Sequence, residues 1–503
     1  MGRSETAIAI AGAVAVLAVG HEALRLSATG ARASSVQSAS GGFQWAWTLN
    51  GPVSGEAGDD IAAAADGTMF IAGHHGGIDR DGDGSIDVPA DGIDPLFLKI
   101  SAEGKLQWIR SPSSPGFNVG SGVAPDRQGG AYASGSFRER LSFGSGRSLP
   151  GHGDSDGFLA RYDADGDLVW ARAVAGPANQ SLLDVATDAA GNAFVVGFGG
   201  GSFSFEERGQ AFRALAQATI LVASYNPEGR LRWARVASSP APSYARTVAL
   251  APDGHVVISG DYRGGSVDLD GDGEQDLPQR PGRSGFIARF GPEGALVGAW
   301  SISGAEGVLG TGIAFAGNGD LLLSGTLAAP ADFDDDGTPD AGVRSGGQTS
   351  AFLARYSPVG KLLWVRAYTM DGAWDVAADG QRLVLSGFYR GARDLDEDGE
   401  TEPHASDPKR ESDLAVLIVS ERGQPERVWI APGPGNDQAR GAVFLSGQPI
   451  LYVTGFVQLT VDFTGTGENQ KGGIRCDALG DLFFARYRLP GAVGRDARRS
   501  LET

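Results

Sequence analysis

The sequence predicts an all-β fold, a seven-bladed β-propeller of four-stranded blades. Three observations predict it. A hairpin sequence recurs about every 60 to 65 residues, a strand-pair sequence precedes each copy, and the strand that the last unit lacks stands near the start of the chain. Composition agrees, because 78 glycines and 25 prolines punctuate short apolar runs, and long helical periodicity is absent beyond the N-terminus.

The hairpin is clearest from Asp156 to Arg172, which reads DGFLARYDADGDLVWAR. Two runs rich in aromatic and branched residues favour strands, and a tetrad that ends in Gly separates them. A type I turn explains the tetrad, because a polar first side chain can bond the turn backbone and the Gly takes the left-handed position. The pattern occurs five times, at 101–104, 163–166, 226–229, 291–294 and 357–360.

A tryptophan marks the fourth strand of most units. Four tryptophans hold the same place after the hairpin Gly: Trp108, Trp170, Trp233 and Trp364. Unit four has Gly298 there, with Trp300 two residues later on the same strand face. Unit six has Trp429 after a turn that we interpret as longer. We interpret these rings as packing between blades.

Each unit begins with a strand pair such as DVATDAAGNAFVVGF at 184–198, continues through a variable loop, and ends in the hairpin. This pattern divides the chain into seven units, with approximate bounds 59–109, 120–172, 182–235, 245–300, 310–366, 373–430 and 439 onward. The spacing suits one four-stranded blade per unit.

The two ends of the repeat array predict its closure. Unit seven reaches its third strand at 481–487 and then meets Pro490, where the hairpin turn is expected. The missing fourth strand matches Phe43-Gln44-Trp45-Ala46-Trp47, before unit one. An N-terminal strand that completes the last blade closes the ring and leaves no open sheet edge.

Domain boundaries follow from these elements. Residues 1–33 resemble a secretory signal peptide, with Arg3, the apolar core AIAIAGAVAVLAVG and a small-x-small site at Ala31-Arg32-Ala33. An uncleaved membrane anchor is the alternative, although the apolar run is short for a span. We expect a linker at 34–42, the propeller at 43–490 and a disordered tail at 491–503.

Charge and cysteine content limit the partners. The formal net charge of −19 argues against nucleic acid or an anionic membrane surface as a partner. Cys476 is the only cysteine, so the chain cannot form an internal disulfide. From the signal-like segment at 1–33 we expect an exported protein that is periplasmic, on the cell surface or extracellular, with no membrane contact beyond the signal or anchor. An exported chain of this size can do without a disulfide, since its core is large.

The FLARYDADGDLVWAR-like hairpins and the DVATDAAGNAFVVG-like strand pairs resemble the bacterial seven-bladed β-propeller repeat family often called SBBP. The resemblance extends from Phe43 to Leu489. It implies a propeller in an exported bacterial protein. It implies little about activity, because fold alone does not license a function.

Four units carry an acidic run of the form D-x-D-x-D-G-x-x-[DE] between their second and third strands. Its candidate ligands are Asp79, Asp81, Asp83 and Asp87; Asp268, Asp270, Asp272 and Asp276; Asp332, Asp334, Asp336 and Asp340; and Asp394, Asp396, Asp398 and Glu402. Calcium takes six to eight oxygens, and acids at positions 1, 3, 5 and 9 with a bend at Gly in position 6 can supply them. The run resembles the start of an EF-hand loop and the calcium hairpins of integrin α-subunit propellers.

The alternative is that these runs are only turn-formers. Their occurrence in register in four repeats favours metal, and unpaired carboxylates this close would repel. Calcium is preferred to magnesium, which favours compact sites with retained water. Units two, three and seven lack the acids at 143–146, 203–205 and 462–466. The sequence therefore predicts about four structural Ca²⁺ sites.

The sequence shows no catalytic constellation. It holds six histidines, and the adjacent His74 and His75 should point to opposite strand faces. There is no zincin motif or P-loop. The Y-D-x-x-G-x-x-x-W pattern resembles the tryptophan-docking repeat of pyrroloquinoline quinone dehydrogenases, but the Thr before the Gly is absent.

Two functions remain open. The first is a non-enzymatic binding or structural module, stabilised by calcium, on a bacterial cell surface or outside the cell, with an unidentified protein or glycan partner. The alternative is an enzyme, a lyase, glycoside hydrolase or quinoprotein, with its site at the mouth of the central channel. The enzyme would show clustered acids, His or Arg outside the repeat consensus.

Overall fold

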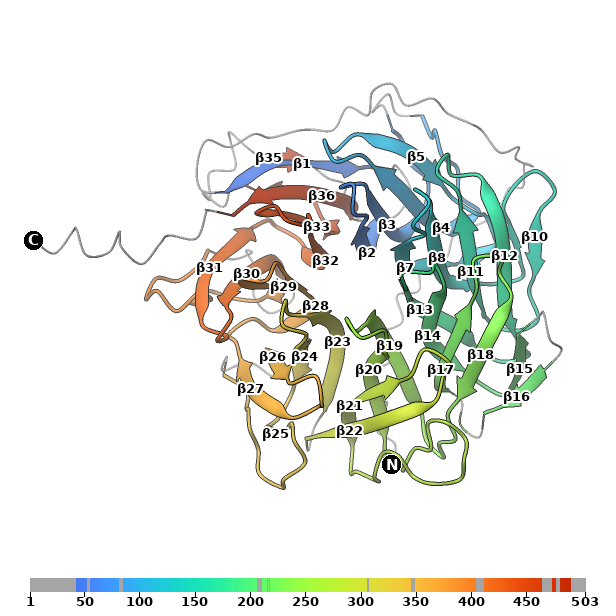
Figure 1. The fold of residues 1–503 in the computed structure, drawn as a ribbon. Coiled ribbons are helices and arrows are strands. Elements are labelled where there is room, and N and C mark those ends of the chain that lie inside the picture. The colour runs from blue at the N-terminus through green and yellow to red at the C-terminus, as the bar shows by residue number, and fades with distance from the viewer. Residues whose placement is uncertain are drawn as a thin grey trace, which may run out of the picture.

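The computed structural model describes residues 42–51, 55–80, 85–205, 210–214, 216, 218–304, 307–344, 349–403, 411–463, 473–475 and 480–489. Most of these residues form seven main antiparallel sheets, which are arranged as a ring (Figure 1). The described chain contains no helix, and none of it could span a membrane as one. The predicted seven-bladed β-propeller is confirmed.

Blades one to six each contribute four consecutive main strands, from the centre of the ring outward. Blades one to three contain β2 (Ala57–Ala63), β3 (Met69–His75), β4 (Gly92–Ile100) and β5 (Leu106–Arg110); β7 (Val119–Pro125), β8 (Ala131–Phe137), β11 (Asp156–Tyr162) and β12 (Leu168–Ala175); and β13 (Gln180–Thr187), β14 (Ala193–Gly199), β17 (Thr219–Tyr225) and β18 (Leu231–Val236). Blades four to six contain β19 (Ser243–Leu250), β20 (Val256–Arg263), β21 (Arg283–Phe290) and β22 (Leu296–Gly304); β23 (Val308–Phe315), β24 (Leu321–Leu327), β26 (Ser350–Tyr356) and β27 (Leu362–Ala367); and β28 (Gly372–Ala378), β29 (Arg382–Tyr389), β30 (Asp413–Ser420) and β31 (Pro425–Ala431).

Blade seven is completed from both ends of the described chain, as predicted. It contains β32 (Gln438–Phe444), β33 (Ile450–Val457) and β36 (Asp481–Arg488), and β1 (Phe43–Leu49) pairs antiparallel with β36. Trp47 and Phe43 are buried there, so the closing strand joins the core as well as the backbone ladder. The ring leaves no open edge at this junction.

Short strands lie outside the main ladders. They are β6 (Gly116–Phe117), β9 (Arg140–Ser142), β10 (Ser148–Pro150), β15 (Ser202–Phe205), β16 (Gln210–Arg213), β25 (Ala331–Asp332), β34 (Thr460–Asp462) and β35 (Gly473–Arg475). Three pairs of them form hairpins between the second and third strands of blades two, three and seven. These are the blades whose sequences lack the acidic run.

The hairpin turns have the predicted chemistry. In the turn that starts at Asp163, the Gly166 amide donates to the Asp163 carbonyl at 3.0 Å, and Gly166 has φ +78°. The Asp163 carboxylate accepts the backbone amides of Asp165 and Asp167 at 3.0 and 2.8 Å. A Cβ on Gly229, in the equivalent turn, would lie 2.7 Å from the Trp170 ring, so this glycine also allows close packing between blades.

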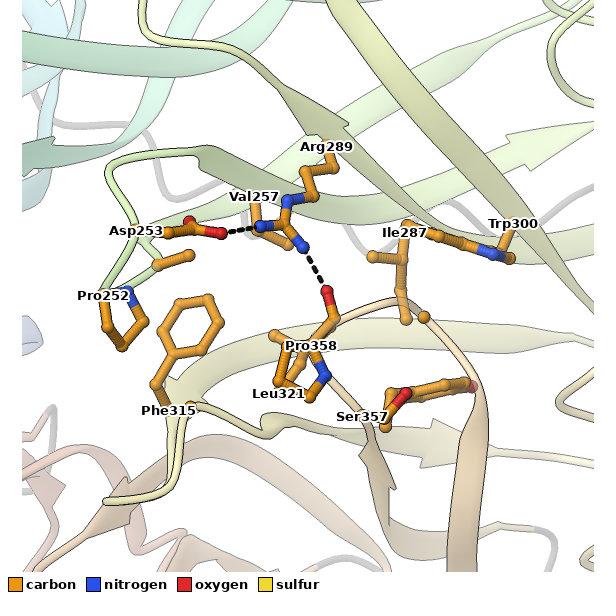
Figure 2. A pocket seen from close by; sticks show the side chains of 14 residues that line it. Pro252, Asp253, Val257, Ile287, Arg289, Trp300, Phe315, Leu321, Ser357 and Pro358 are labelled. Carbon is orange, nitrogen blue, oxygen red and sulfur yellow. Dashed lines mark hydrogen bonds and ion pairs between the residues drawn. The ribbon is translucent and has the colours of Figure 1, made fainter.

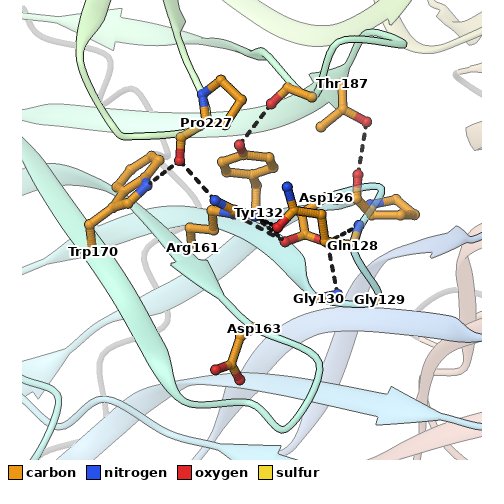
Figure 3. Close-up of polar contacts among 12 residues, drawn as sticks. Asp126, Gln128, Gly129, Gly130, Tyr132, Arg161, Asp163, Trp170, Thr187 and Pro227 are labelled. Atoms are coloured by element: carbon orange, nitrogen blue, oxygen red, sulfur yellow. Dashed lines mark hydrogen bonds and ion pairs between the residues drawn. The ribbon is translucent and has the colours of Figure 1, made fainter.

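Adjacent blades are joined by a repeated contact at the hairpin turn (Figure 3). Arg161 is almost buried and bonds Asp126 of its own blade at 2.8 Å. Its guanidinium and the Trp170 Nε1 both donate to the Pro227 carbonyl of the next blade, each at 2.9 Å. One carbonyl thus accepts a cation and an indole across the blade boundary.

The prediction that Trp429 of blade six follows a longer hairpin turn is wrong. The turn there has the usual length, with Gly423 N donating to Ser420 O. Arg427 therefore takes the register position that Trp364 holds in blade five, and Trp429 pairs with Val416 two residues farther along the strand. The ring of Trp429 stacks on Tyr487 of blade seven, with centroids 4.3 Å apart.

Candidate metal loops and the channel cluster

The acidic runs lie where the sequence predicts them, between the second and third strands of blades one, four, five and six. An antiparallel bridge closes the base of each loop: Ile78 with Val88, Val267 with Leu277, Ala331 with Ala341, and Arg393 with Glu402. The residue at position 2 is buried in three loops, as Leu269, Phe333 and Leu395. Apolar contacts below the loop therefore fix the ends of an otherwise exposed acidic segment.

Three loops bring three carboxylates to one point. The ligand oxygens of each group lie within 4.8 Å of one another. The groups are Asp268, Asp270 and Asp276; Asp332, Asp334 and Asp336; and Asp394, Asp396 and Asp398. Asp272, Asp340 and Glu402 belong to the same loops but stand outside these groups. In the loop of blade one, the predicted ligands Asp81 and Asp83 lie outside the described residues, whereas Asp79 and Asp87 are described.

The acid at position 9 has a shared role in all four loops. One of its oxygens accepts the backbone amide of position 2, always at 2.7 Å. The pairs are Arg80 with Asp87, Leu269 with Asp276, Phe333 with Asp340, and Leu395 with Glu402. This contact holds one carboxylate oxygen inside the loop and leaves the second oxygen available.

The acid at position 1 organises the bend. In blade five, the Asp332 carboxylate accepts the amides of Asp335 and Gly337 at 2.7 and 2.8 Å. In blade four, Asp268 accepts the amides of Gly271 and Gly273 at 2.7 and 3.0 Å. The backbone therefore wraps around the first carboxylate, as a chelating loop requires.

Two positions in the bend have left-handed backbone. Gly273, Gly337 and Gly399 at position 6 have φ between +92° and +94°, as the sequence predicts. Position 4 is also left-handed, at Gly271 with φ +82° and at Asp335 and Glu397 with φ +62°. Sequence reasoning missed position 4, because only one of these three residues is a glycine. A shared, strained conformation in non-glycine residues is typical of functional loops.

Proximity of the acids disfavours their ionisation. Burial, followed by the charges of Asp270, Asp268 and Asp272, raises the pKa of Asp276. Burial and the neighbouring loop acids likewise raise the pKa of Asp340 and of Glu402. A cation at the centre would reverse this repulsion, since it favours the ionised form of each ligand.

A second polar cluster lies at the inner strands, where blade seven meets blade one. Asp59 bonds His74 Nδ1 at 2.8 Å and forms an ion pair with Arg440 of β32. Burial opposes ionisation of Asp59, but Arg440 and His74 more than offset it, so its pKa is below the ordinary value. His75 points to the other face, where burial lowers its pKa to about 3 and Ser111 contacts its Nε2 at 2.7 Å.

All seven inner strands have a bulge at the same place, and Asp59 lies within the bulge of blade one. The register shifts lie between 58 and 60, 120 and 122, 182 and 184, 245 and 247, 310 and 312, 373 and 375, and 439 and 441. After three of these bulges an Asp carboxylate accepts a backbone amide of the next blade: Asp60 from Val123, Asp184 from Val248, and Asp375 from Ala442, at 2.8 to 3.0 Å. The sequence analysis did not find these inter-blade contacts.

The comparisons with known proteins give only partial or distant matches. No family model matches the chain. An uncharacterised WD repeat-containing protein, L264 of Acanthamoeba polyphaga mimivirus, is 28% identical over 150 residues, which is 28% of this chain. The match spans 11% of the viral protein's length.

Solved structures with similar folds are distant in sequence. The Neurospora crassa Pan2 WD40 domain is 7% identical with a TM-score of 0.40, and the match covers 92% of this chain and 97% of that domain. A gluconolactonase from Xanthomonas campestris is 14% identical with a TM-score of 0.31, over 73% of this chain and 86% of that one. The assignment of the chain as a seven-bladed β-propeller rests on its own sheets.

Proposed function

We propose that this protein is an exported β-propeller whose blades one, four, five and six bind calcium, and that it acts as a non-enzymatic binding or structural module outside the cell. The observation that carries the proposal is the shared construction of the acidic loops. Three of them gather three carboxylates within 4.8 Å, and all four fix the position 9 acid on the position 2 amide. Export and a bacterial surface role rest on the predicted signal peptide and the SBBP resemblance.

Calcium fits these loops better than the alternatives because the donors are carboxylate oxygens on a bent, partly exposed backbone. Calcium accepts six to eight such oxygens in flexible geometry, and water or backbone carbonyls can supply the ligands that the carboxylates do not. Each loop also closes on a short bridge, and three of the loops have a buried side chain at position 2. Metal binding would therefore lower repulsion in the loop and stabilise the connection between the second and third strands of its blade.

The test is thermal unfolding of residues 34–503 in millimolar calcium and in EGTA, together with calorimetric titration. We expect a higher unfolding midpoint with calcium, since a ligand that binds the folded state at one hundred times its Kd adds about 2.7 kcal/mol per site. Asp332→Asn should remove one site. Asp165→Asn is the matched control, because it removes the same charge from an exposed hairpin turn. No midpoint shift and no bound calcium would refute the metal proposal.

A second candidate is an enzyme, which the Asp59–His74–Arg440 cluster specifically favours. A carboxylate that orients a histidine, beside a cation that can hold an anion, is a combination used in acid–base catalysis. Its test is a screen for lyase, glycoside hydrolase and quinone-dependent turnover with wild-type protein and His74→Gln. Turnover lost in His74→Gln but retained in His255→Gln would favour this candidate over the first.

A further inference from the structure

A cavity of about 210 Å³ lies between blades four and five (Figure 2). Its wall includes Val257 and Arg289 of blade four and Tyr356 and Pro358 of blade five. Pro252, Asp253 and Pro358 on its rim are exposed, so the cavity reaches the protein surface.

The cavity occupies the place that a tryptophan fills in other blades. In the strand register, Trp108 faces Lys99, Trp170 faces Arg161 and Trp233 faces Ser224. The residue that faces Arg289 in blade four is Gly298, which has no side chain. Blade four thus lacks an indole at the register position from which blades one to three place one against the next blade.

The missing ring has two defined neighbours in those blades. One comes from the second strand of the same blade and one from the third strand of the next, with all ring centroids 5.7 to 6.4 Å from the indole. They are Phe70 and Tyr162 around Trp108, Tyr132 and Tyr225 around Trp170, and Phe194 and Phe290 around Trp233. Around Gly298, these two places are held by Val257 of blade four and Tyr356 of blade five, and both line the cavity.

The hydrogen-bond acceptor of the missing indole is also present. Trp108, Trp170 and Trp233 donate Nε1 to the carbonyl of the second turn residue of the next blade, at 2.9 to 3.3 Å. That residue is Pro358 beyond blade four, and its carbonyl accepts Arg289. The Pro227 carbonyl accepts both an arginine and an indole, so a carbonyl in this position can take a second donor.

Trp300 fills only part of the gap. It stands two residues beyond Gly298, opposite Ile287, and its ring lies against Gly360, as the rings of Trp170 and Trp233 lie against Gly229 and Gly294 of the next blades. Its ring forms one wall of the space that remains. The remaining volume exceeds the roughly 150 Å³ of an engineered apolar cavity that binds benzene.

We propose that this cavity binds a small planar aromatic molecule of the indole class, with its ring between Val257 and Tyr356 and its N–H donated to the Pro358 carbonyl. The shape and the acceptor are those that the other blades provide for their own tryptophan. The proposal is independent of the calcium loops, because no acidic-run residue lines the cavity.

The first test is calorimetric titration with indole and with indene, which has the same shape without the N–H donor. We expect indole to bind, and indene to bind about tenfold more weakly, since one hydrogen bond of about 1.4 kcal/mol corresponds to that factor. Indole and indene binding equally would remove the Pro358 contact from the proposal, and no binding of indole at its solubility limit would overturn the proposal as a whole.

Two variants localise the binding. Gly298→Trp should abolish indole binding by restoring the missing ring, and Val257→Phe should weaken it at least tenfold by restoring the residue type of blade three. Val297→Trp is the matched control, because Val297 is exposed on the same strand. Wild-type affinity in a folded Gly298→Trp and a folded Val257→Phe would overturn the proposed location. N-acetyltryptophanamide tells whether the natural ligand is a free indole or the tryptophan side chain of a peptide. It competes with indole only if the cavity accepts such a side chain.

Discussion

Arg344 donates a hydrogen bond to Glu397 at 2.9 Å, and this ion pair joins the acidic loop region of blade five to the acidic loop of blade six. Arg280 of blade four forms the same contact with Asp335 of blade five. Both arginines lie 12 residues after the first acid of their own loop, and both acids hold position 4 of the next. The three successive candidate metal loops are therefore linked in series.

The linkage predicts that Arg344→Met destabilises the metal-free protein more than the calcium-bound protein. Arg344 partly neutralises an acidic loop, and bound calcium would supply that positive charge instead. The loss should be at most about 1 kcal/mol, because the pair is half exposed. Unfolding midpoints in EGTA and in calcium measure the difference. Arg230→Met is the control, since its pair with Glu228 is exposed and outside the loops; an equal effect under both conditions contradicts the prediction.

Calcium stoichiometry tests the loop of blade one, whose central acids lie outside the described residues. We expect four sites in the wild-type protein and three in each of Asp81→Asn and Asp270→Asn, because each change removes a ligand from one loop. Calorimetric titration counts them. A wild-type stoichiometry of three that Asp81→Asn leaves unchanged would show that blade one does not bind.

Asp375 predicts a specific pH dependence of stability. Although the side chain retains some exposure, burial raises the pKa of Asp375 to about 7 in the folded protein, above its ordinary value of 3.8. The ionised form is therefore disfavoured by folding, and this group lowers the free energy of unfolding as the pH rises from about 4 to about 7. Asp375→Asn, which can still accept the Ala442 amide, should stabilise the protein at pH 8 and have little effect at pH 4. Chemical denaturation at the two pH values compares them, and an equal effect at both would contradict the assignment.

The buried pair between Arg161 and Asp126 should be costly to break. Arg161→Met leaves the Asp126 carboxylate buried with only the backbone amides of Gln128 and Gly130, at 2.8 Å each. Removal of one member of a buried ion pair costs roughly 3–5 kcal/mol. Denaturant unfolding measures the loss, and Arg161→Met combined with Asp126→Asn should recover part of it. A loss below 1 kcal/mol would mean that the pair is not essential to the blade boundary.

Removal of residues 1–49 tests ring closure. The deletion removes β1 and leaves the outer edge of β36 without a partner strand, and an unpaired sheet edge promotes association. We expect dimers or larger species in light scattering, and recovery of monomer when a peptide of residues 42–50 is added. A stable monomer without the peptide would show that blade seven does not need its fourth strand.

Local sequence predicts the elements whose chemistry is local. The turn at Asp163, the Gly at position 6 of the acidic loops and the alternation that buries Trp170 are all set by residues within a few positions of one another. Closure could be predicted as well, because the repeat count leaves one strand missing. The left-handed backbone of Asp335 and Glu397 could not be predicted from the sequence, since the surrounding loop imposes a conformation that these residues do not favour.

The hydrogen bonds that Asp60, Asp184 and Asp375 form between blades were the other element that sequence did not reveal. Each of these aspartates lies next to a bulge and bonds the amide of a residue more than 60 positions away. Nothing within their own strands distinguishes them from ordinary exposed acids. Gly298 is the reverse case, because the sequence shows a missing tryptophan but not whether a neighbour fills the space.

The register of β1 on β36 has a consequence for attachment. Phe43 lies opposite Tyr487, so the described chain enters and leaves the ring at the same end of one blade. Any segment that precedes Phe43 or follows Leu489, whether native or added as a fusion, would be tethered at a single point on the molecule. Immobilisation through either terminus should therefore present the disc in a similar orientation to a binding partner.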